Sequence, residues 1–341
     1  MEYQAAIKAL SQADLAPVYV LQGSEWYLQQ TFRQALAQRV EDQVGELDSV
    51  LFDLNEQSID EVLDESQAYS FFVDQRLVVV ENLDFLNPQS KQKLTKDQEA
   101  RLEAYLQDPN PATHLVLIIP ADKIDQRRRL TKLLQKHSQY IQVTPLSDQE
   151  VRRHLQDALR AASIDINREA LDEVLKRTNY QLTQAMAEAQ KLIQYASGGA
   201  SITVEVVRQL VTRSLESNVF ELTNAIMRRD FKESVQIYQD LLLMKNEPVQ
   251  LHALVVSQFR LLIQVKLLQA QGLMEDGIAQ QLGVHPYRVK LAARSSRAIP
   301  LAGLADLYED LIERDYQMKT NVGQKETHFY LMLTHYMQMN Q

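Results

Sequence analysis

The sequence of 341 residues contains no cysteine. It can therefore form no disulfide framework, no zinc site with thiolate ligands and no thiol nucleophile. No apolar run approaches the roughly 20 residues that cross a bilayer. The first residues also lack the basic and apolar sections of a secretory signal. These absences predict a soluble, cytoplasmic protein that does not enter a membrane.

Positive charge is missing from one long stretch of a chain whose formal net charge is -9. Residues 40–75 include no Lys or Arg, while acids such as Asp53, Asp60 and Asp64 recur there. An acidic surface repels phosphates, so a nucleic acid would have to meet the chain elsewhere. The simplest interpretation of the stretch is a solvated acidic face.

Short β-branched runs alternate with helical segments in residues 1–145. Nearly continuous apolar strands with helices between them predict a parallel sheet covered on both faces. We expect Ser24 to cap the helix that follows the first strand. The segment is therefore predicted to be an α/β domain. Its expected strands are residues 17–21, 49–53, 77–80, 114–119 and 140–143.

The strand signal ends after Pro145, and everything beyond it has helical periodicity. Ser147 followed by Glu150 predicts a capping box. We expect residues 146–213 to form a small helical lid domain. Residues 214–341 are predicted to form a larger bundle of about five helices, interrupted near 246–248, Gly272, Gly283 and 299–300.

An α/β domain followed by a helical lid resembles the AAA+ nucleotide-binding module, but the residues that use ATP are missing. A phosphate-binding loop needs several glycines, a lysine and a Ser or Thr. Residues 22–27 read Gln-Gly-Ser-Glu-Trp-Tyr, with one glycine and an acid. The third strand ends in Glu81-Asn82 rather than Asp-Glu, and residues 179–184 offer no sensor arginine. The pattern predicts the shape of the module without its reaction.

Other catalytic patterns are also missing. The seven histidines show no metal-binding spacing, and there is no Gly-x-Ser-x-Gly motif. We therefore predict no catalytic residue, no metal site and no cofactor. A free enzyme, a pure scaffold and a DNA-binding regulator remain as alternatives to a binding subunit.

Five segments together resemble the delta subunit of the bacterial DNA polymerase III clamp loader. They are residues 17–28, 70–86, 115–132, 258–262 and 282–292, and the resemblance covers essentially the whole chain. It implies a non-catalytic, AAA+-like subunit that binds no ATP and whose C-terminal domain joins a collar. It also implies a role in DNA replication, with nucleotidyltransferase activity only by membership of the polymerase complex.

The same resemblance implies the partners. They are the ring-shaped sliding clamp (beta), the ATPase subunits (gamma or tau) and delta-prime in a hetero-pentamer, with primed DNA reached through the complex. Delta would grip the clamp and open one of its interfaces. The protein would then work in the cytoplasm at the replisome on the nucleoid.

The clamp contact is expected at Ser70, Phe71, Phe72 and Val73. Two adjacent aromatic side chains cannot both point to one face of a helix, so at least one is expected to be exposed. Exposed aromatic anchors are typical of interface hot spots. By resemblance, Phe71 and Phe72 would enter an apolar pocket of the clamp. The alternative is that both pack beneath the acidic helix.

Two further features could meet DNA. A dense basic stretch with Leu130, Leu133 and Leu134 as its apolar stripe predicts an amphipathic helix with a cationic face. That face could contact phosphates or acids of a neighbouring subunit, or it could simply be solvated. Residues 277–294 resemble a helix-turn-helix, which would make the protein a DNA-binding regulator. The basic residues of the first feature are Lys123, Arg127, Arg128, Arg129, Lys132 and Lys136.

Overall fold

The computed structural model describes residues 1–69, 73–87, 90, 92–320 and 324–338. The chain forms two compact units, Met1–Leu146 and Ser147–Gln341. The predicted combination of an α/β region followed by an all-helical region is confirmed. The further division of the second unit into a lid (146–213) and a collar (214–341) stays a prediction.

The first unit is built on a five-stranded sheet in which all neighbouring strands are parallel. Each predicted strand is confirmed, since continuous apolar runs suit strands that are buried on both faces. The order across the sheet is β2-β3-β4-β1-β5. The bounds are β1 Val18–Gln22, β2 Asp48–Asp53, β3 Arg76–Glu81, β4 Thr113–Ile119 and β5 Gln139–Gln142.

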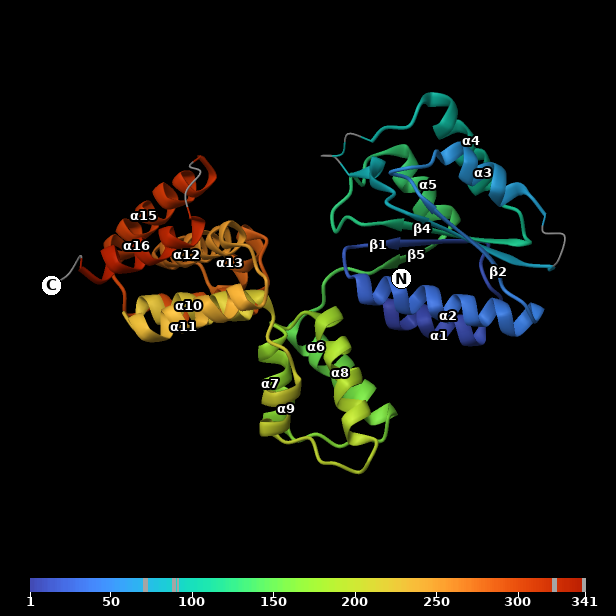
Figure 1. Ribbon diagram of the computed structural model, residues 1–341. Helices are drawn as coiled ribbons and strands as arrows, with labels where there is room; N and C mark the ends of the chain where they lie inside the picture. The colour runs from blue at the N-terminus through green and yellow to red at the C-terminus, as the bar shows by residue number, and fades with distance from the viewer. Residues whose placement is uncertain (70–72, 88–89, 91, 321–323, 339–341) are drawn as a thin grey trace. The chain divides into compact units, whose positions relative to one another are not determined.

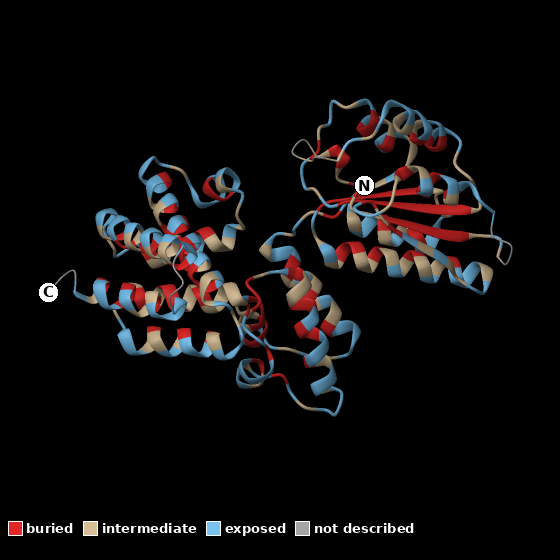
Figure 2. Ribbon diagram, turned by 45° about the horizontal axis from the view of Figure 1, so that its top comes forward, coloured by how far each residue is buried: buried red, intermediate tan, exposed pale blue. Residues whose placement is uncertain are grey.

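Helices cover both faces of this sheet (Figure 1). Helices α1 (Tyr3–Gln12) and α2 (Trp26–Val44) lie on one face. On the other face lie α3 (Ile59–Gln67), α4 (Lys96–Gln107) and α5 (Arg129–His137), with the short helix η1 (Asp84–Leu86) after β3. The inner strands β1, β3 and β4 are consequently almost entirely buried (Figure 2).

The second unit contains only helices within its described residues, apart from a single β-bridge between Ile166 and Ile202. The predicted capping box is confirmed, because Ser147 and Glu150 bond reciprocally at the start of α6. The bounds are α6 Asp148–Ala161, α7 Arg168–Arg177, α8 Leu182–Ala196, α9 Val204–Leu210, α10 Leu215–Met227, α11 Phe231–Leu243, α12 Pro248–Ala270, α13 Glu275–Leu282, α14 Pro286–Ser296, α15 Leu301–Thr320 and α16 Lys325–Gln338.

The predicted number of about five helices after residue 214 is wrong, because the described part of this region holds seven, α10 to α16. One missed break separates α10 from α11. Arg229 adopts a left-handed φ of 59° there, and the Asp230 side chain caps α11 by accepting from the Glu233 N–H. This turn has neither glycine nor proline, so the usual sequence signal is missing.

Helix α12 is the central helix of the second unit. Its 23 residues have the length and composition of a helix that could cross a membrane, since an 18-residue window within it has a mean hydropathy of 1.4. However, 56% of its apolar window is buried within the protein. Residues such as Phe259, Leu262 and Val265 contribute to the core. The opposite side of α12 is exposed and carries Ser257, Arg260 and Gln264, so α12 is an amphipathic core helix of the bundle.

Two histidines are buried in the cores of the two units. His114 on β4 is 2% exposed, and its Nδ1 lies 2.9 Å from the carbonyl oxygen of Ala16. His252 on α12 is 1% exposed, and its Nε2 lies 2.8 Å from the carbonyl oxygen of Leu311. Burial lowers the pKa of each imidazole. The folded protein therefore favours the neutral form of both side chains.

Acid is expected to destabilise the protein through these two histidines. Unfolded histidine has a pKa of about 6.5, so below that pH the unfolded chain binds more protons than the folded chain. The free energy of unfolding should then fall by up to about 1.4 kcal/mol per pH unit for each histidine, and level off below the folded-state pKa. Urea unfolding between pH 7.5 and 5 measures this. A His114→Gln/His252→Gln variant should show a shallower slope, and an unchanged slope would refute the explanation.

Candidate functional site

The carboxyl end of β1 is where an open parallel sheet would bind its ligand, since the helices that follow the neighbouring strands β1 and β4 lie on opposite faces (Figure 1). Three successive backbone N–H groups follow β1, and all three have partners within the unit. Gly23 donates to the Ile119 carbonyl at 3.0 Å, and Glu25 donates to the Val143 carbonyl at 2.9 Å. Ser24 donates to Asp122 Oδ1 at 2.8 Å. The donors that a phosphate-binding loop would offer are therefore already used.

Side chains also close this loop. Gln22 Nε2 donates to the carbonyl oxygens of Ala121 and Asp122, both at 2.8 Å. Gln29 Nε2 donates to the Gly23 carbonyl at 2.7 Å. A Cβ atom on Gly23 would lie 2.3 Å from the Val143 backbone. The loop is thus packed directly against the segments that follow β4 and β5.

The predicted helix cap at Ser24 is wrong. Glu25 occupies the N-cap of α2, and its carboxylate accepts a hydrogen bond from the Tyr27 N–H at 3.4 Å. The Ser24 hydroxyl donates instead to Asp122 Oδ2 at 3.0 Å. The carboxylate of Asp122 therefore occupies the position from which a phosphate would accept a hydrogen bond from the Ser24 N–H. No local sequence pattern indicates this partnership, which joins residues 98 positions apart.

The acid at the end of β3 is also neutralised within the unit. Glu81 forms an ion pair with Arg33 of α2. Asn82 has a left-handed φ of 61°, and its Nδ2 donates to Asp53 Oδ1 at 2.7 Å. That bond, followed by the bond from the Asn55 N–H, lowers the pKa of Asp53. Among the described residues no group of three or more His, Asp or Glu side chains could hold a metal ion.

Of the four residues expected to contact the clamp, Ser70, Phe71 and Phe72 lie outside the described residues. Val73 is half-buried. Tyr69, immediately before them, is 72% exposed. Neither alternative for the two phenylalanines is therefore decided by the structure, and the site stays a prediction.

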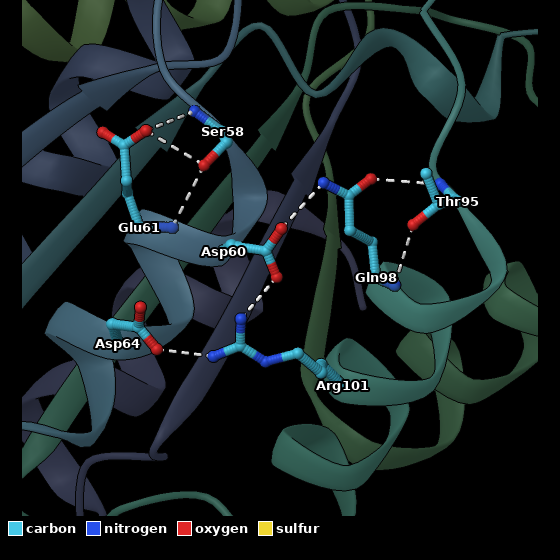
Figure 3. Close-up of polar contacts among 7 residues, drawn as sticks. All are labelled: Ser58, Asp60, Glu61, Asp64, Thr95, Gln98 and Arg101. Carbon is cyan, nitrogen blue, oxygen red and sulfur yellow. Dashed lines mark hydrogen bonds and ion pairs between the residues drawn. The ribbon is translucent and has the colours of Figure 1, made fainter.

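The helix that leads to this segment is firmly held (Figure 3). Helix α3 begins with a capping box of Ser58 and Glu61. Asp60 accepts a hydrogen bond from Gln98 of α4 at 2.8 Å, and this bond lowers the pKa of Asp60. Arg101 of α4 forms ion pairs with both Asp60 and Asp64. Two acids of the predicted acidic surface, Asp60 and Asp64, are therefore tied to α4.

The strand that follows the segment is anchored by Arg76. Its side chain is 8% exposed and lies 2.6 Å from Glu65 of α3 and 3.3 Å from Asp48 of β2. Asn110 Nδ2 lies 3.4 Å from the carbonyl oxygens of Ser66 and Gln67. Helix α3 and strand β3, which precede and follow residues 70–73 in the chain, are therefore fixed to the same core. The sequence gives no local signal for Arg76, because its partners come from other elements.

Replacing Arg76 with methionine is expected to lower the free energy of unfolding by about 2 kcal/mol. The loss is smaller than the 3–5 kcal/mol typical of a broken buried ion pair, because Asp48 and Glu65 are about a third exposed and can regain water. Chemical unfolding followed by circular dichroism measures the loss. Arg127→Met is the matched control, since that side chain is 93% exposed and should cost no more than about 0.5 kcal/mol.

The structure divides the predicted basic stretch into two parts. Helix α5 begins only at Arg129, so Lys123 and Arg127 precede it, and the prediction of one helix through all the basic residues is wrong. Arg128 donates to the Phe85 carbonyl and pairs with Glu99 of α4, and Arg129 pairs with Glu103. These pairs hold α5 against α4.

A smaller exposed cationic surface remains on this part of the unit. Arg127, Arg129, Lys132 and Lys136 line one shallow depression, and Lys123 is exposed in the preceding loop. Leu130 and Leu134 of α5 are buried and Leu133 is half-buried, as the apolar stripe predicts. Contact of these cations with DNA or with another subunit stays a prediction.

The helix-turn-helix predicted for residues 277–294 has the expected local shape. Helices α13 and α14 are joined through Gly283, which adopts a left-handed φ of 64°. Val289 and Ala292 of α14 are buried in the core. Arg288 and Arg294 line a cavity of the second unit, and both Lys290 and Arg294 are exposed. The DNA-regulator alternative stays a prediction.

Two family models match the chain. The model described as DNA polymerase III, delta subunit, matches residues 19–144. The model described as the C-terminal domain of the DNA polymerase III delta subunit matches residues 216–336. The two matches together take in parts of both compact units.

Individual relatives agree with these matches. DNA polymerase III subunit delta of Bacillus subtilis is 35% identical over 98% of this chain and 96% of its own length. A probable DNA polymerase III subunit delta of Aquifex aeolicus is 23% identical over 82% of this chain and 79% of its own length. A solved structure of the Bacillus subtilis DNA clamp loader delta protein is 35% identical, with a TM-score of 0.72, and covers 98% of this chain and 99% of that one.

Proposed function

The chain belongs to the DNA polymerase III delta subunit family, and on that basis we propose that it binds the sliding clamp and opens it for loading onto primed DNA. A role in DNA replication as an accessory subunit of the polymerase follows from the family itself. The observation that carries the finer proposal is the 35% identity with a clamp loader delta protein along nearly the whole chain.

We propose that the subunit works by binding and without ATP chemistry of its own. The N–H groups after β1 are bonded to Ile119, Asp122 and Val143, and Glu81 is paired with Arg33, which supports this proposal. A protein that binds the open clamp more tightly than the closed clamp shifts the population toward the open form. The energy that releases the clamp would then come from the ATPase subunits.

The proposed partners follow from membership of the loader. They are the clamp, the gamma or tau ATPase subunits and delta-prime, with residues 214–341 as the collar that joins the hetero-pentamer. Primed DNA would be reached through the complex, in the cytoplasm at the replisome. Residues 1–213 would form the AAA+-like arm that carries the clamp contact at residues 70–73.

Calorimetric titration of purified sliding clamp into this chain, in a buffer free of nucleotide, tests the proposal. We expect saturable binding that is unchanged when ATP and magnesium are added. A pure scaffold would bind the other loader subunits and ignore the clamp. Absence of clamp binding, or binding only in the presence of ATP, would overturn the proposal.

A further inference from the structure

A cavity of about 300 Å³ lies within the second unit, whereas the residues of the proposed clamp contact belong to the first unit. It is formed by the end of α7, the segment before α10, α10 itself and one face of α14. Charged side chains dominate its wall, and the cations outnumber the acids. The charged residues are Lys176, Arg177, Arg213, Arg288 and Arg294 with Glu173, Glu216 and Glu221.

Arg177 forms a fixed part of the wall. Its Nε donates to the Val211 carbonyl at 2.9 Å, and its Nη2 donates to the Arg208 carbonyl at 3.0 Å. Glu173 lies 3.5 Å from Arg177 and 3.6 Å from Arg208, so its single charge is shared by two arginines. Burial, followed by the neighbouring guanidinium of Arg213, lowers the pKa of Arg177. The cations in this wall are therefore close enough to repel one another.

Four other cations of the cavity are not neutralised. Within the described ranges, no ion pair engages Lys176, Arg213, Arg288 or Arg294. With Glu173 already shared between two arginines, these four cations share the cavity only with Glu216 and Glu221 of α10. A concave site with uncompensated positive charge concentrates its potential and attracts anions.

Helix α14 presents two of these arginines together. Arg288, Leu291 and Arg294 recur every three residues and line the cavity from one face of the helix. The opposite side of α14 is fixed by Val289 and Ala292 in the core. The backbone that carries the two arginines is therefore held in place by packing, which reduces the cost of ordering them around a ligand.

We propose that this cavity binds the phosphate groups of a multiply charged phosphate ligand. Guanidinium groups offer forked donors that match phosphate oxygens. The volume is at the lower end of the range for small-ligand sites, and Phe220 and Tyr287 supply apolar wall beside the cations. A soluble polyphosphate and a polynucleotide backbone share this chemistry.

Calorimetry on the full chain with inorganic pyrophosphate, and separately with a single-stranded oligodeoxythymidylate, tests the proposal. We expect binding that weakens as salt is raised. An Arg213→Gln/Arg294→Gln variant should bind at least about tenfold more weakly, since two charge-assisted contacts are lost. The matched control is Arg168→Gln/Arg297→Gln, which removes two exposed arginines that do not line the cavity and should leave affinity within about twofold.

Pyrophosphate and the oligonucleotide distinguish between a soluble polyphosphate and a polynucleotide backbone as the natural ligand. Pyrophosphate binding that depends on the cavity arginines supports a soluble ligand. Oligonucleotide binding with the same dependence, but no binding of pyrophosphate, supports a polynucleotide backbone. Thermal unfolding of each variant confirms that the fold is kept. The proposal is overturned if neither ligand binds, or if the cavity variant and the control variant bind equally well.

Discussion

Replacing Gly23 with alanine is expected to destabilise the first unit by about 4 kcal/mol. Gly23 has a φ of 141°, which L side chains rarely adopt, and a residue held in such a region costs about 1–3 kcal/mol. The new Cβ would also lie 2.3 Å from backbone atoms of Val143, which cannot turn aside as a side chain could. Overpacking of this kind adds about 1–3 kcal/mol.

Thermal unfolding monitored by circular dichroism measures this effect, and we expect a fall in the Tm of the first unit on the order of 10 °C. Gly198→Ala is the matched control, because nothing lies within 4 Å of the added Cβ and its φ is not positive. An unchanged Tm for Gly23→Ala would mean that the loop after β1 is not closed against Val143. The proposed absence of a phosphate site at that loop would then lose its structural support.

The Phe71→Ala/Phe72→Ala variant is expected to lose at least about 2 kcal/mol of clamp-binding free energy, or roughly 30-fold in affinity. The physical reason is that aromatic anchors at an interface bury a large apolar area in the partner. Calorimetry with purified clamp measures the loss, and circular dichroism checks that the variant is folded.

Phe231→Ala is the control for this variant, since Phe231 on α11 is 47% exposed and is not part of the proposed contact. Its clamp affinity should match the wild type. If the folded double variant binds as tightly as the control, the two phenylalanines do not form the contact. The alternative that they pack beneath α3 would then be favoured.

The sequence predicted the sheet well because its strands carry their own signal. Residues 18–21 and 115–119 are continuous apolar runs, a pattern typical of short strands that are covered on both faces. The capping box of Ser147 and Glu150 was also readable, because both partners lie within one turn. By contrast, the break at Arg229 has no glycine or proline and was missed.

The features that decide the candidate site are long-range and could not be read from the sequence. Ser24 bonds to Asp122, and Arg76 joins Asp48 to Glu65, because the fold brings separate elements together. The sequence alone showed that the glycines and the lysine of a phosphate-binding loop are missing after the first strand. That the backbone donors after β1 have other partners became visible only in the structure. Phe71 and Phe72 were selected with the help of the family resemblance.

Opening of the clamp is the central claim, and a clamp labelled with a fluorophore pair across one subunit interface tests it most directly. We expect the addition of this chain alone, without nucleotide, to separate the pair and change its fluorescence. The Phe71→Ala/Phe72→Ala variant should leave the signal unchanged. A clamp that stays closed while the wild-type chain is bound at saturation would contradict the claim.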